Sequence, residues 1–174
     1  DTNSRILCYD IRDLGKQLLP VGMLVVLDSV FNRIIRNRRL GRSTWVYIDE
    51  IYLLFQHEYS ANFLFTLWKR VRKYGACCTG LTQNVDDLLQ SHTARTMLAN
   101  SEFLVMLNQA STDRAELAHL LNISDNQLSY ITNVDFGRGL IKCGSAIVPF
   151  MDHFPKNNLY RLMSTKLSET DAAA

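Results

Sequence analysis

The sequence has no apolar run long enough to span a bilayer and no signal-peptide pattern. If the protein works at a membrane, we therefore expect it to act from one side. The net charge of +2 is too small to argue for nucleic acid or an anionic membrane as a partner. The chain also lacks internal repeats and low-complexity segments. Its 174 residues, 47% of them hydrophobic, predict about one globular domain with a real core.

Several kinds of reactive site are missing as well. The four cysteines form no Cys-x-x-Cys pair and have no ligand spacing with the four histidines, and neither Gly-x-Ser-x-Gly nor a Cys/His pairing occurs. We therefore assign no metal cluster and no covalent nucleophile. Cys77 and Cys78 lie in an apolar, strand-like run, which predicts buried, reduced thiols of a cytosolic protein. The residues considered are Cys8, Cys77, Cys78, Cys143, His57, His92, His119 and His153.

What the chain does contain is an alternation of apolar strand-like runs with amphipathic helical segments. Pro20 suits a helix start, and Gly41 and Gly75 suit the residues that follow helix ends. The alternation predicts an α/β fold: a mostly parallel sheet flanked by helices, with an antiparallel hairpin at one edge. The expected strands are 5–11, 45–48, 76–83, 102–107, 140–143 and 146–150. The expected helices are 20–39, 59–73, 93–99, 112–121 and one opened by a capping box at 124–127.

The most informative stretch is Trp45-Val46-Tyr47-Ile48-Asp49-Glu50, an apolar run that ends in two carboxylates. A buried strand of this kind delivers both acids to the carboxyl edge of a sheet, where α/β proteins place their ligand crevices. In phosphoryl-transfer ATPases the first acid holds the magnesium shell and a neighbouring group orients the attacking water, an arrangement called Walker B. The alternative is a buried strand followed by an acidic helix start, which the helix dipole favours.

A second polar element, Thr82-Gln83-Asn84, follows the next predicted strand. Consecutive strands of a parallel sheet often lie side by side, so Gln83 could reach the same crevice as Glu50. There its amide could contact a γ-phosphate or hold the attacking water. Alone, a turn residue that satisfies loop backbone is the simpler interpretation. Two polar strand ends in succession favour a shared site.

Two basic clusters flank the Walker B-like strand. Lys69-Arg70-Val71-Arg72-Lys73 places four cations at a helix end, where they suit the dipole. A sharper hypothesis is that Arg70 or Arg72 projects toward the nucleotide of a neighbouring subunit and neutralises transition-state charge. The cluster from Arg33 to Arg42 could meet DNA phosphates, but it has no interleaved aromatic residues, which favours a solvated surface.

One expected element does not occur: no Gly-x-x-x-x-Gly-Lys-Ser/Thr phosphate loop, the Walker A motif, is present. The only Gly-Lys pair, Gly15-Lys16, is followed by glutamine and lacks the upstream glycine. We therefore expect the chain to be the C-terminal part of a larger ATPase and to bind ATP weakly by itself. Residues 1–154 would form the C-terminal part of the ATPase domain and residues 155–174 a polar tail.

The order of these motifs closely resembles the C-terminal half of the conjugative-transfer and type IV secretion ATPases of the VirB-four, TraC and TraE kind, which are relatives of the HerA and FtsK translocases. The resemblance covers residues 5–150. Its most specific part is Arg-Lys-Tyr-Gly followed, after a single strand, by Thr-Gln-Asn. The matching segments are Tyr9-Asp10, Trp45–Glu50, Lys69–Gly75, Leu81–Asn84, Asn100–Phe103, Leu128-Ser129 and Gly137–Ile141.

The resemblance implies a RecA-like core that assembles as a homo-hexamer with ATP between subunits. Asp49 would coordinate Mg2+ through water, Glu50 would activate the hydrolytic water, and Gln83 would sense the γ-phosphate. Arg70, Arg72 or Arg138 would act in trans on a neighbour's nucleotide. The resemblance further implies a cytoplasmic protein, peripheral at the inner face of the membrane, that works with channel components and with DNA or a relaxase–DNA substrate.

Two other functions remain open from the sequence. The same fold could serve a DNA-pumping translocase of the HerA or FtsK class, for which DNA-stimulated hydrolysis and salt-sensitive DNA binding would be expected. It could also be a catalytically dead RecA-like module that acts only as an interaction surface. An upstream phosphate loop in the same reading frame would exclude the last alternative.

Overall fold

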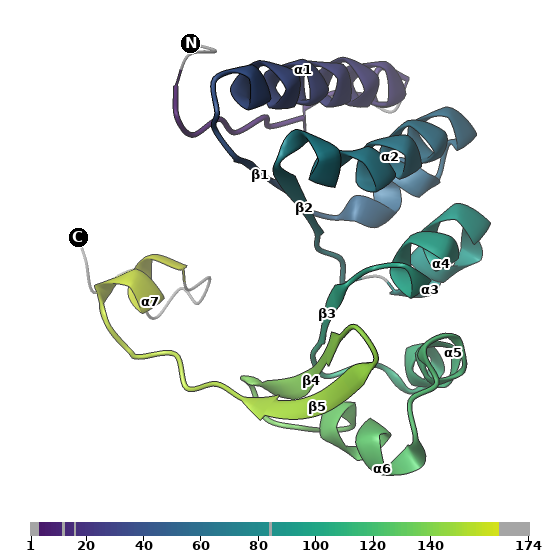
Figure 1. The fold of residues 1–174 in the computed structure, drawn as a ribbon. Coiled ribbons are helices and arrows are strands. Elements are labelled where there is room, and N and C mark those ends of the chain that lie inside the picture. The colour runs from purple at the N-terminus through teal and green to yellow at the C-terminus, as the bar shows by residue number, and fades with distance from the viewer. Residues whose placement is uncertain (1–3, 12, 16, 84, 164–174) are drawn as a thin grey trace. The chain divides into compact units, whose positions relative to one another are not determined.

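The structure is a computed structural model that describes residues 4–11, 13–15, 17–83 and 85–163. The contacts within the chain divide it into two compact units, residues 1–100 (unit 1) and residues 101–174 (unit 2). Each has its own sheet: the two strands β1 and β2 in unit 1, and the three strands β3, β4 and β5 in unit 2. Helices and strands alternate through unit 1, as Figure 1 shows.

Unit 1 is built around a parallel pair of strands. In this pair Thr44 lies opposite Ala76, and Ile48 lies opposite Gly80. The helix α2 carries the chain from the end of β1 back to the start of β2, so the two strands and the helix form a βαβ unit. The elements in order are α1 (Leu19–Arg39), β1 (Thr44–Ile48), a 3-10 helix (Ile51–Phe55), α2 (Glu58–Arg70), a 3-10 helix (Val71–Tyr74), β2 (Ala76–Gly80), α3 (Val85–Gln90) and α4 (His92–Ala99).

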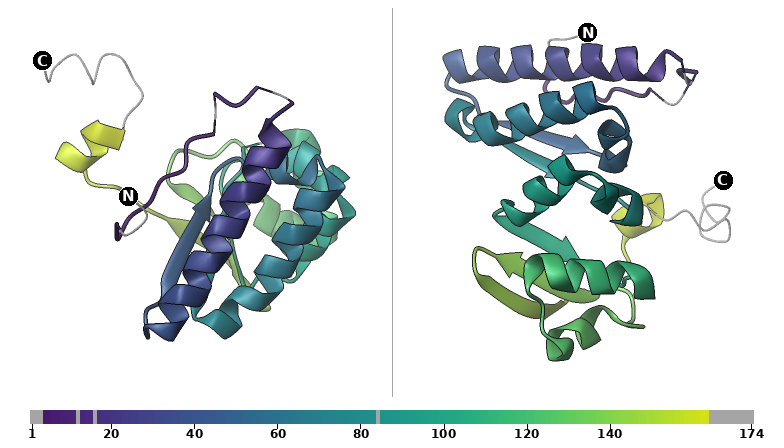
Figure 2. Two further views of the ribbon diagram at one scale, coloured as in Figure 1. Left: turned by 90° about the horizontal axis from the view of Figure 1, so that it is seen from above. Right: turned by 90° about the vertical axis from the view of Figure 1, so that its right-hand side faces the viewer.

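The apolar stripes of α1 and α2 form the core of unit 1, as the helical spacing predicted. Ile34 on α1 and Leu64 on α2 are fully buried, and Val46 of β1 packs against the same core. The two helices contact one another and lie over one face of the strand pair, which the views of Figure 2 show. Both predicted C-caps are confirmed, because Gly41 and Gly75 adopt the left-handed conformation, each with φ of +66°.

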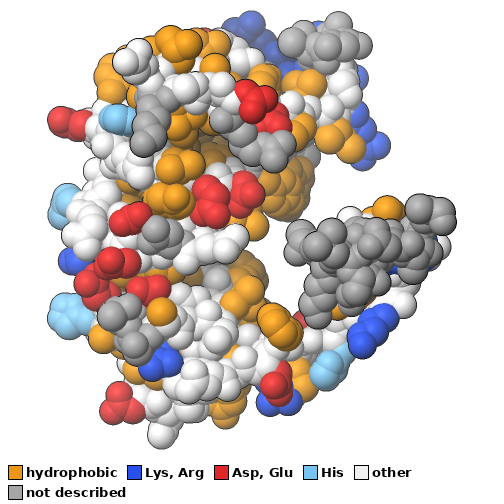
Figure 3. Space-filling model, turned by 180° about the vertical axis from the view of Figure 1, so that it is seen from behind, with side chains coloured by type: hydrophobic (Ala, Val, Ile, Leu, Met, Phe, Trp, Pro, Cys, Tyr) orange, Lys and Arg blue, Asp and Glu red, His pale blue; other side chains and the backbone are white. Residues whose placement is uncertain are grey.

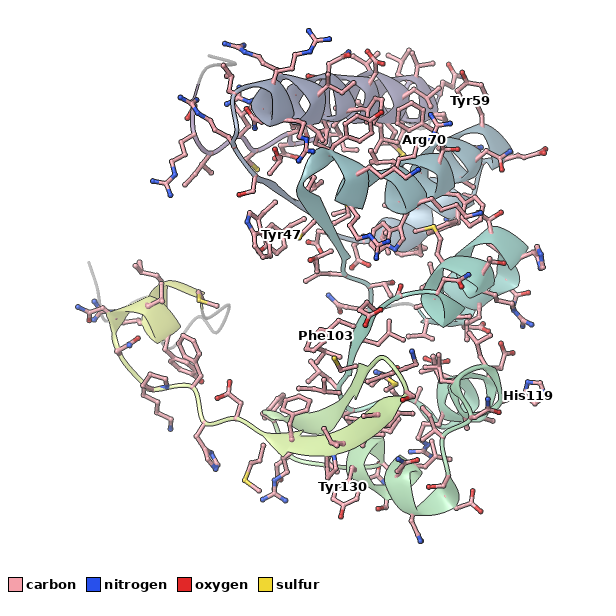
Figure 4. The ribbon with its side chains drawn as sticks, in the orientation of Figure 1. Tyr47, Tyr59, Arg70, Phe103, His119 and Tyr130 are labelled. Carbon is pink, nitrogen blue, oxygen red and sulfur yellow. The ribbon has the colours of Figure 1, made fainter. Side chains whose placement is uncertain are left out.

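The prediction that β1 and β2 are buried strands is wrong for one of their two faces. Trp45 and Tyr47 of β1 are 65% and 67% exposed, and Cys77 of β2 is exposed too. Side chains alternate along a strand, and the described helices of unit 1 cover only the face that carries Val46 and Ile48. Figure 4 shows Tyr47 projecting away from α2. Hydrophobic side chains also lie at the surface in several other places, as Figure 3 shows.

The predicted strand at 5–11 is also wrong. The described residues of this segment have no strand conformation, and Ile6 is 82% exposed. Side-chain bonds tie the segment to α1 instead of to a sheet. The Tyr9 hydroxyl lies 3.0 Å from the Ser29 hydroxyl, and the Arg33 guanidinium donates to the Ser4 carbonyl at 2.9 Å. An apolar composition alone cannot supply the ladder partner that a strand needs.

Unit 2 pairs its three strands antiparallel, and the predicted strand at 102–107 and hairpin with its turn at Gly144-Ser145 are confirmed. The predicted capping box is present: the backbone N–H of Gln127 donates to the Ser124 hydroxyl, and the backbone N–H of Ser124 donates to Gln127 Oε1. The elements are β3 (Phe103–Met106), α5 (Ser111–Leu121), α6 (Asp125–Leu128), a 3-10 helix (Ser129–Ile131), β4 (Arg138–Cys143), β5 (Ala146–Met151) and α7 (Asn158–Met163).

The fold class is therefore confirmed: an α/β protein with a parallel strand pair, flanking helices and an antiparallel sheet. Sequence patterns missed α3, α7 and the 3-10 helix after Glu50, all of them six residues or shorter. The proposed boundary at residue 154 stays a prediction. Of the tail, residues 164–174 lie outside the described residues, as do Arg12, Lys16 and Asn84.

Candidate functional site

The two acids after β1 lie beside the end of β2, because the strands are parallel and in register. Ile48, the last residue of β1, pairs with Gly80, the last residue of β2. The Leu81 N–H donates to the Ile48 carbonyl at 2.8 Å, and the Ile51 N–H donates to the Leu81 carbonyl at 2.9 Å. These two bonds hold the segments that follow both strands together. The edge that they form, called here the carboxyl edge, carries Asp49 and Glu50 next to Thr82 and Gln83.

Glu50 has a backbone conformation that L-residues rarely adopt. Its φ and ψ are 48° and 49°, in the left-handed region, directly before the 3-10 helix Ile51–Phe55. This conformation costs a non-glycine residue roughly 1–2 kcal/mol. The Glu50 N–H donates to Asp49 Oδ1 at 3.1 Å, so the first acid supports the turn that orients the second. Such strain at a polar strand end is typical of positions where a side chain must point in one direction.

The Glu50 carboxylate is the most unusual polar group in the described part of the chain. Its Oε2 atom is buried and accepts no hydrogen bond. Buried polar atoms in proteins are nearly always paired, since an unpaired one costs about 1–3 kcal/mol. Asp49, by contrast, is exposed and uses Oδ1 within its own turn. The carboxyl edge thus holds one exposed carboxylate and one whose second oxygen is buried without a hydrogen-bond partner.

Gln83 lies three residues after the end of β2 and is exposed. The parallel pairing places it at the same edge as Glu50, which is the arrangement that the sequence predicted. Asn84, the last residue of the Thr-Gln-Asn element, lies outside the described residues. The role of Gln83 stays a prediction.

Arg70 and Arg72 lie at the opposite edge of the same strands. They precede Gly75, whose carbonyl accepts the N–H of Thr44 at the start of β1. The helix α2 begins near the carboxyl edge and ends at this amino edge, as a βαβ unit requires. Both arginines are exposed. Arg70 lines one end of a groove of about 460 Å³ between α1 and α2, whose other walls include Phe31, Tyr59 and Phe63.

Arg138 belongs to unit 2, at the start of β4. It forms an exposed ion pair with Asp135, with 3.7 Å between Nη2 and Oδ2. The turn between them contains Gly137 with φ of +78°, where an added Cβ would collide with the Asp152 carbonyl oxygen. In unit 1, Asp49, Glu50 and Gln83 therefore lie at the carboxyl edge. Arg70 and Arg72 lie at the amino edge of the same unit. Arg138 belongs to unit 2.

No three His, Cys, Asp or Glu side chains among the described residues lie close enough together to bind a metal ion by themselves. A hydrated Mg2+ needs less, because this ion keeps several waters and takes one or two carboxylates. Asp49, the exposed carboxylate of the carboxyl edge, fits that requirement. Within the described residues no helix is long and apolar enough to cross a membrane.

Burial was predicted for Cys77 and Cys78, and the prediction is wrong for Cys77. All four are free thiols, but Cys8, Cys77 and Cys143 are exposed and only Cys78 is half-buried. Burial, and to a smaller extent the neighbouring Cys77, raise the pKa of the Cys78 thiol to about 12. Cys77 and Cys78 point to opposite faces of β2, and only the face of Cys78 is covered.

Sequence reasoning missed the two features that mark Glu50: its left-handed backbone and its buried oxygen. Neither has a reliable signal in the sequence, because both depend on how the chain turns from β1 into an unpredicted 3-10 helix. The groove beside Arg70 was missed too. A pattern search finds the apolar face of α2 but cannot tell where two helices leave space between them.

Comparisons with known proteins agree with this fold. The chain resembles a solved structure of VirB4 of Thermoanaerobacter pseudethanolicus, with a TM-score of 0.75 and 24% sequence identity. That match covers 86% of this chain and 41% of the VirB4 chain, and at this identity it shows the fold alone. No curated protein sequence matches the chain. The TraG P-loop domain family matches residues 3–138, which is most of the chain. The chain belongs to the TraG P-loop domain family.

Proposed function

We propose that this chain is part of a motor ATPase that energises type IV secretion or conjugative transfer. The observation that carries the proposal is the buried, unpaired Oε2 of Glu50, held beside the end of the neighbouring parallel strand. A hydrolytic ATPase needs a carboxylate that is fixed in direction and free to accept a proton. Family membership and the VirB4-like fold support the same conclusion.

Each residue of the carboxyl edge has a proposed role. Asp49 holds the water shell of Mg2+, and its Oδ1 also keeps the Glu50 turn in place. Glu50 accepts the proton of the attacking water, and Gln83 contacts the γ-phosphate. When bound, Mg-ATP supplies the phosphoanhydride bond and a cation that neutralises the developing charge. The sequence contains no phosphate loop, so we propose that the remaining phosphate contacts come from another part of a longer polypeptide.

We further propose that the active form is a homo-hexamer in which ATP lies between subunits. Arg70 and Arg72 lie at the amino edge, so they would reach the nucleotide of a neighbouring copy and not their own. Arg138 is the third candidate for this role. The assembly would be cytoplasmic and peripheral at the inner face of the membrane, where it contacts channel components and DNA or a relaxase–DNA substrate.

The substitution Glu50→Gln in the full-length ATPase tests the central proposal. It keeps the size of the side chain but removes the proton acceptor, so steady-state hydrolysis should fall by roughly 100-fold or more, while Mg-ATP binding should persist. Asp49→Asn should instead weaken the Mg2+ dependence of binding. Hydrolysis at the wild-type rate by the Glu50→Gln protein would exclude Glu50 as the base. Hydrolysis that requires DNA would point to a DNA translocase.

The 174-residue chain offers a second test. Without a phosphate loop, it should bind Mg-ATP weakly, and titration calorimetry should detect no site of low-micromolar affinity. Tight binding would mean that the described residues provide a phosphate cradle that the sequence does not reveal, and it would contradict the proposal that another segment supplies these contacts.

A further inference from the structure

One face of the antiparallel sheet in unit 2 is entirely apolar. In an antiparallel sheet, residues directly opposite one another point to the same side. The rows on this face are Phe103 with Cys143 and Ala146, Val105 with Ile141 and Val148, and Gly139 with Phe150. No charged or hydrogen-bonding side chain other than a thiol lies on it. This set of eight residues is called here the apolar sheet face.

The apolar sheet face is open, whereas the opposite face of the same sheet is covered at its centre. Phe103, Val105 and Val148 are 58%, 53% and 52% exposed, and Figure 4 shows Phe103 on the side away from α5. On the other side, Leu140 and Met106 are buried, as is Ile131 of the 3-10 helix that contacts β4. A solvated sheet face normally carries polar residues, so a face without them is one that the folded protein covers.

The helix α7 has a matching surface and follows β5 directly. Leu159, Leu162 and Met163 are spaced as i, i+3 and i+4, which places them on one side of the helix. All three are exposed, by 55%, 81% and 65%. A helix of six residues has too few hydrogen bonds to persist alone in water, because isolated helices shorter than about 12 residues are marginal. It requires a surface to pack on.

The connection between β5 and α7 is long enough to bring these two surfaces together. Residues 152–157 span up to roughly 20 Å when extended, whereas the three strands are only about 10 Å across. A short tether also gives α7 an effective concentration of about a millimolar at its own sheet, which exceeds the concentration of a second copy in a dilute solution.

We propose that α7 folds back onto the apolar sheet face of its own chain, with Leu159, Leu162 and Met163 against Val105, Ile141 and Val148. The apolar sheet face is then a docking site whose occupant is the C-terminal helix. This contact buries both exposed apolar surfaces and gives the short helix the partner that it needs. The proposal does not depend on nucleotide binding or on the proposed motor function.

Disulfide trapping in the 174-residue chain tests the contact. The trapping variant combines Val148→Cys with Leu162→Cys, in a background with Cys8→Ser, Cys77→Ser and Cys143→Ala. Cys78 is kept, since burial raises its pKa to about 12 and leaves it unreactive. The matched control replaces Val148→Cys by Met151→Cys. Met151 is 56% exposed, lies on the opposite face of β5 and is closer to Leu162 along the chain.

With a mild oxidant, the Val148–Leu162 pair should form an intramolecular disulfide at least about tenfold faster than the control pair, because docking holds the two sulfur atoms near each other. Equal rates would mean that α7 moves freely, and would overturn the proposal. Disulfide-linked dimers whose yield rises with protein concentration would assign the face to α7 of a second copy, which would overturn it as well.

Hydrogen exchange gives an independent reading without cysteine chemistry. The amides of residues 160–163 should exchange at least about tenfold more slowly than an unfolded peptide in the wild-type chain. Val148→Lys should abolish this protection, whereas Met151→Lys should leave it intact. Unprotected amides in the wild type, or equal protection in both variants, would show that the helix does not dock on the apolar sheet face.

Discussion

Replacing Glu50 by alanine or glycine should make unit 1 more stable, although Glu50 is the residue on which the proposed activity depends. Glu50 adopts the left-handed conformation with φ of 48°, and its buried Oε2 has no hydrogen-bond partner. Both features cost folding free energy in the absence of ligand. Alanine removes the oxygen but keeps the Cβ, and glycine removes both, so the two variants separate the two costs.

The magnitudes decide the direction of the effect. Loss of the unpaired oxygen gains about 1–3 kcal/mol, and relief of the left-handed backbone gains roughly 1–2 kcal/mol. The variants lose partly buried methylene groups, about 1 kcal/mol, and glycine adds an entropic cost of roughly 0.5–1 kcal/mol. The net gain is about 1 kcal/mol for alanine and about 2 kcal/mol for glycine. For a unit of about 100 residues, 2 kcal/mol corresponds to a Tm increase of roughly 8–16 °C.

Tryptophan fluorescence is the suitable assay, because both tryptophans, Trp45 and Trp68, lie in unit 1. Urea unfolding followed at this signal reports unit 1 alone. Asp49→Ala is the matched control: its carboxylate is exposed and accepts the Glu50 N–H, so its loss should give no gain. A lower or unchanged midpoint for both Glu50 variants would refute the reasoning, since it would mean that Oε2 is satisfied in the folded chain.

Two further results are expected of the same chain. Ser60→Ala should lower the free energy of unfolding of unit 1 by about 1–3 kcal/mol. The buried Ser60 hydroxyl donates to the Leu54 carbonyl at 2.6 Å, and the variant leaves that oxygen unpaired. As a control, Ser43→Ala at an exposed site should change the free energy of unfolding by less than about 0.5 kcal/mol. Alkylation at pH 8, detected by mass spectrometry, should modify the three exposed cysteines but not Cys78, because a pKa of about 12 keeps the Cys78 thiol protonated. Rapid modification of Cys78 would contradict its burial.

The sequence predicts the parts of this fold that depend on local periodicity and local chemistry. The apolar spacing along α1 and α2, the left-handed glycines after them and the capping box at Ser124 are all confirmed, because each is fixed by residues within a few positions of one another. The pairing of β1 with β2 was predicted for a similar reason, since a single helix separates them and short connections favour neighbouring strands.

The predictions that are wrong share a different cause. The sequence predicts burial of residues 5–11 and of the outer faces of β1 and β2 because they are apolar, but burial depends on what else packs on them. The described helices of unit 1 cover one face of the strand pair only. In the same way, the position of Asp49 and Glu50 followed from the strand pattern, whereas the free oxygen of Glu50 arises from the turn into a 3-10 helix that has no sequence signal.

The position of Arg70 and Arg72 has a consequence for the proposed motor. The five residues of β1 separate the amino edge from the carboxyl edge by roughly 16 Å at 3.3 Å per residue, which is beyond the hydrogen-bonding reach of an arginine side chain. These arginines therefore cannot serve the site that contains their own Glu50, and if one of them acts at such a site, a second copy must supply it. In a full-length ATPase, Glu50→Gln and Arg72→Ala should each abolish hydrolysis if Arg72 is the residue that acts in trans.

Mixing the two inactive full-length proteins should then restore activity. An interface is complete where the Arg72→Ala subunit supplies Glu50 and the Glu50→Gln subunit supplies Arg72, and random assembly in equal amounts gives about one such interface in four. Hydrolysis should recover to about a quarter of the wild-type rate if the sites act independently. The same mixture made with Glu50→Gln and Asp49→Asn should stay inactive, because both residues belong to one edge of one subunit. Two outcomes would contradict this reasoning: recovery of hydrolysis in the control mixture, or no recovery in the mixture with Arg72→Ala. Either one would mean that Arg72 and the carboxylates do not act from separate subunits.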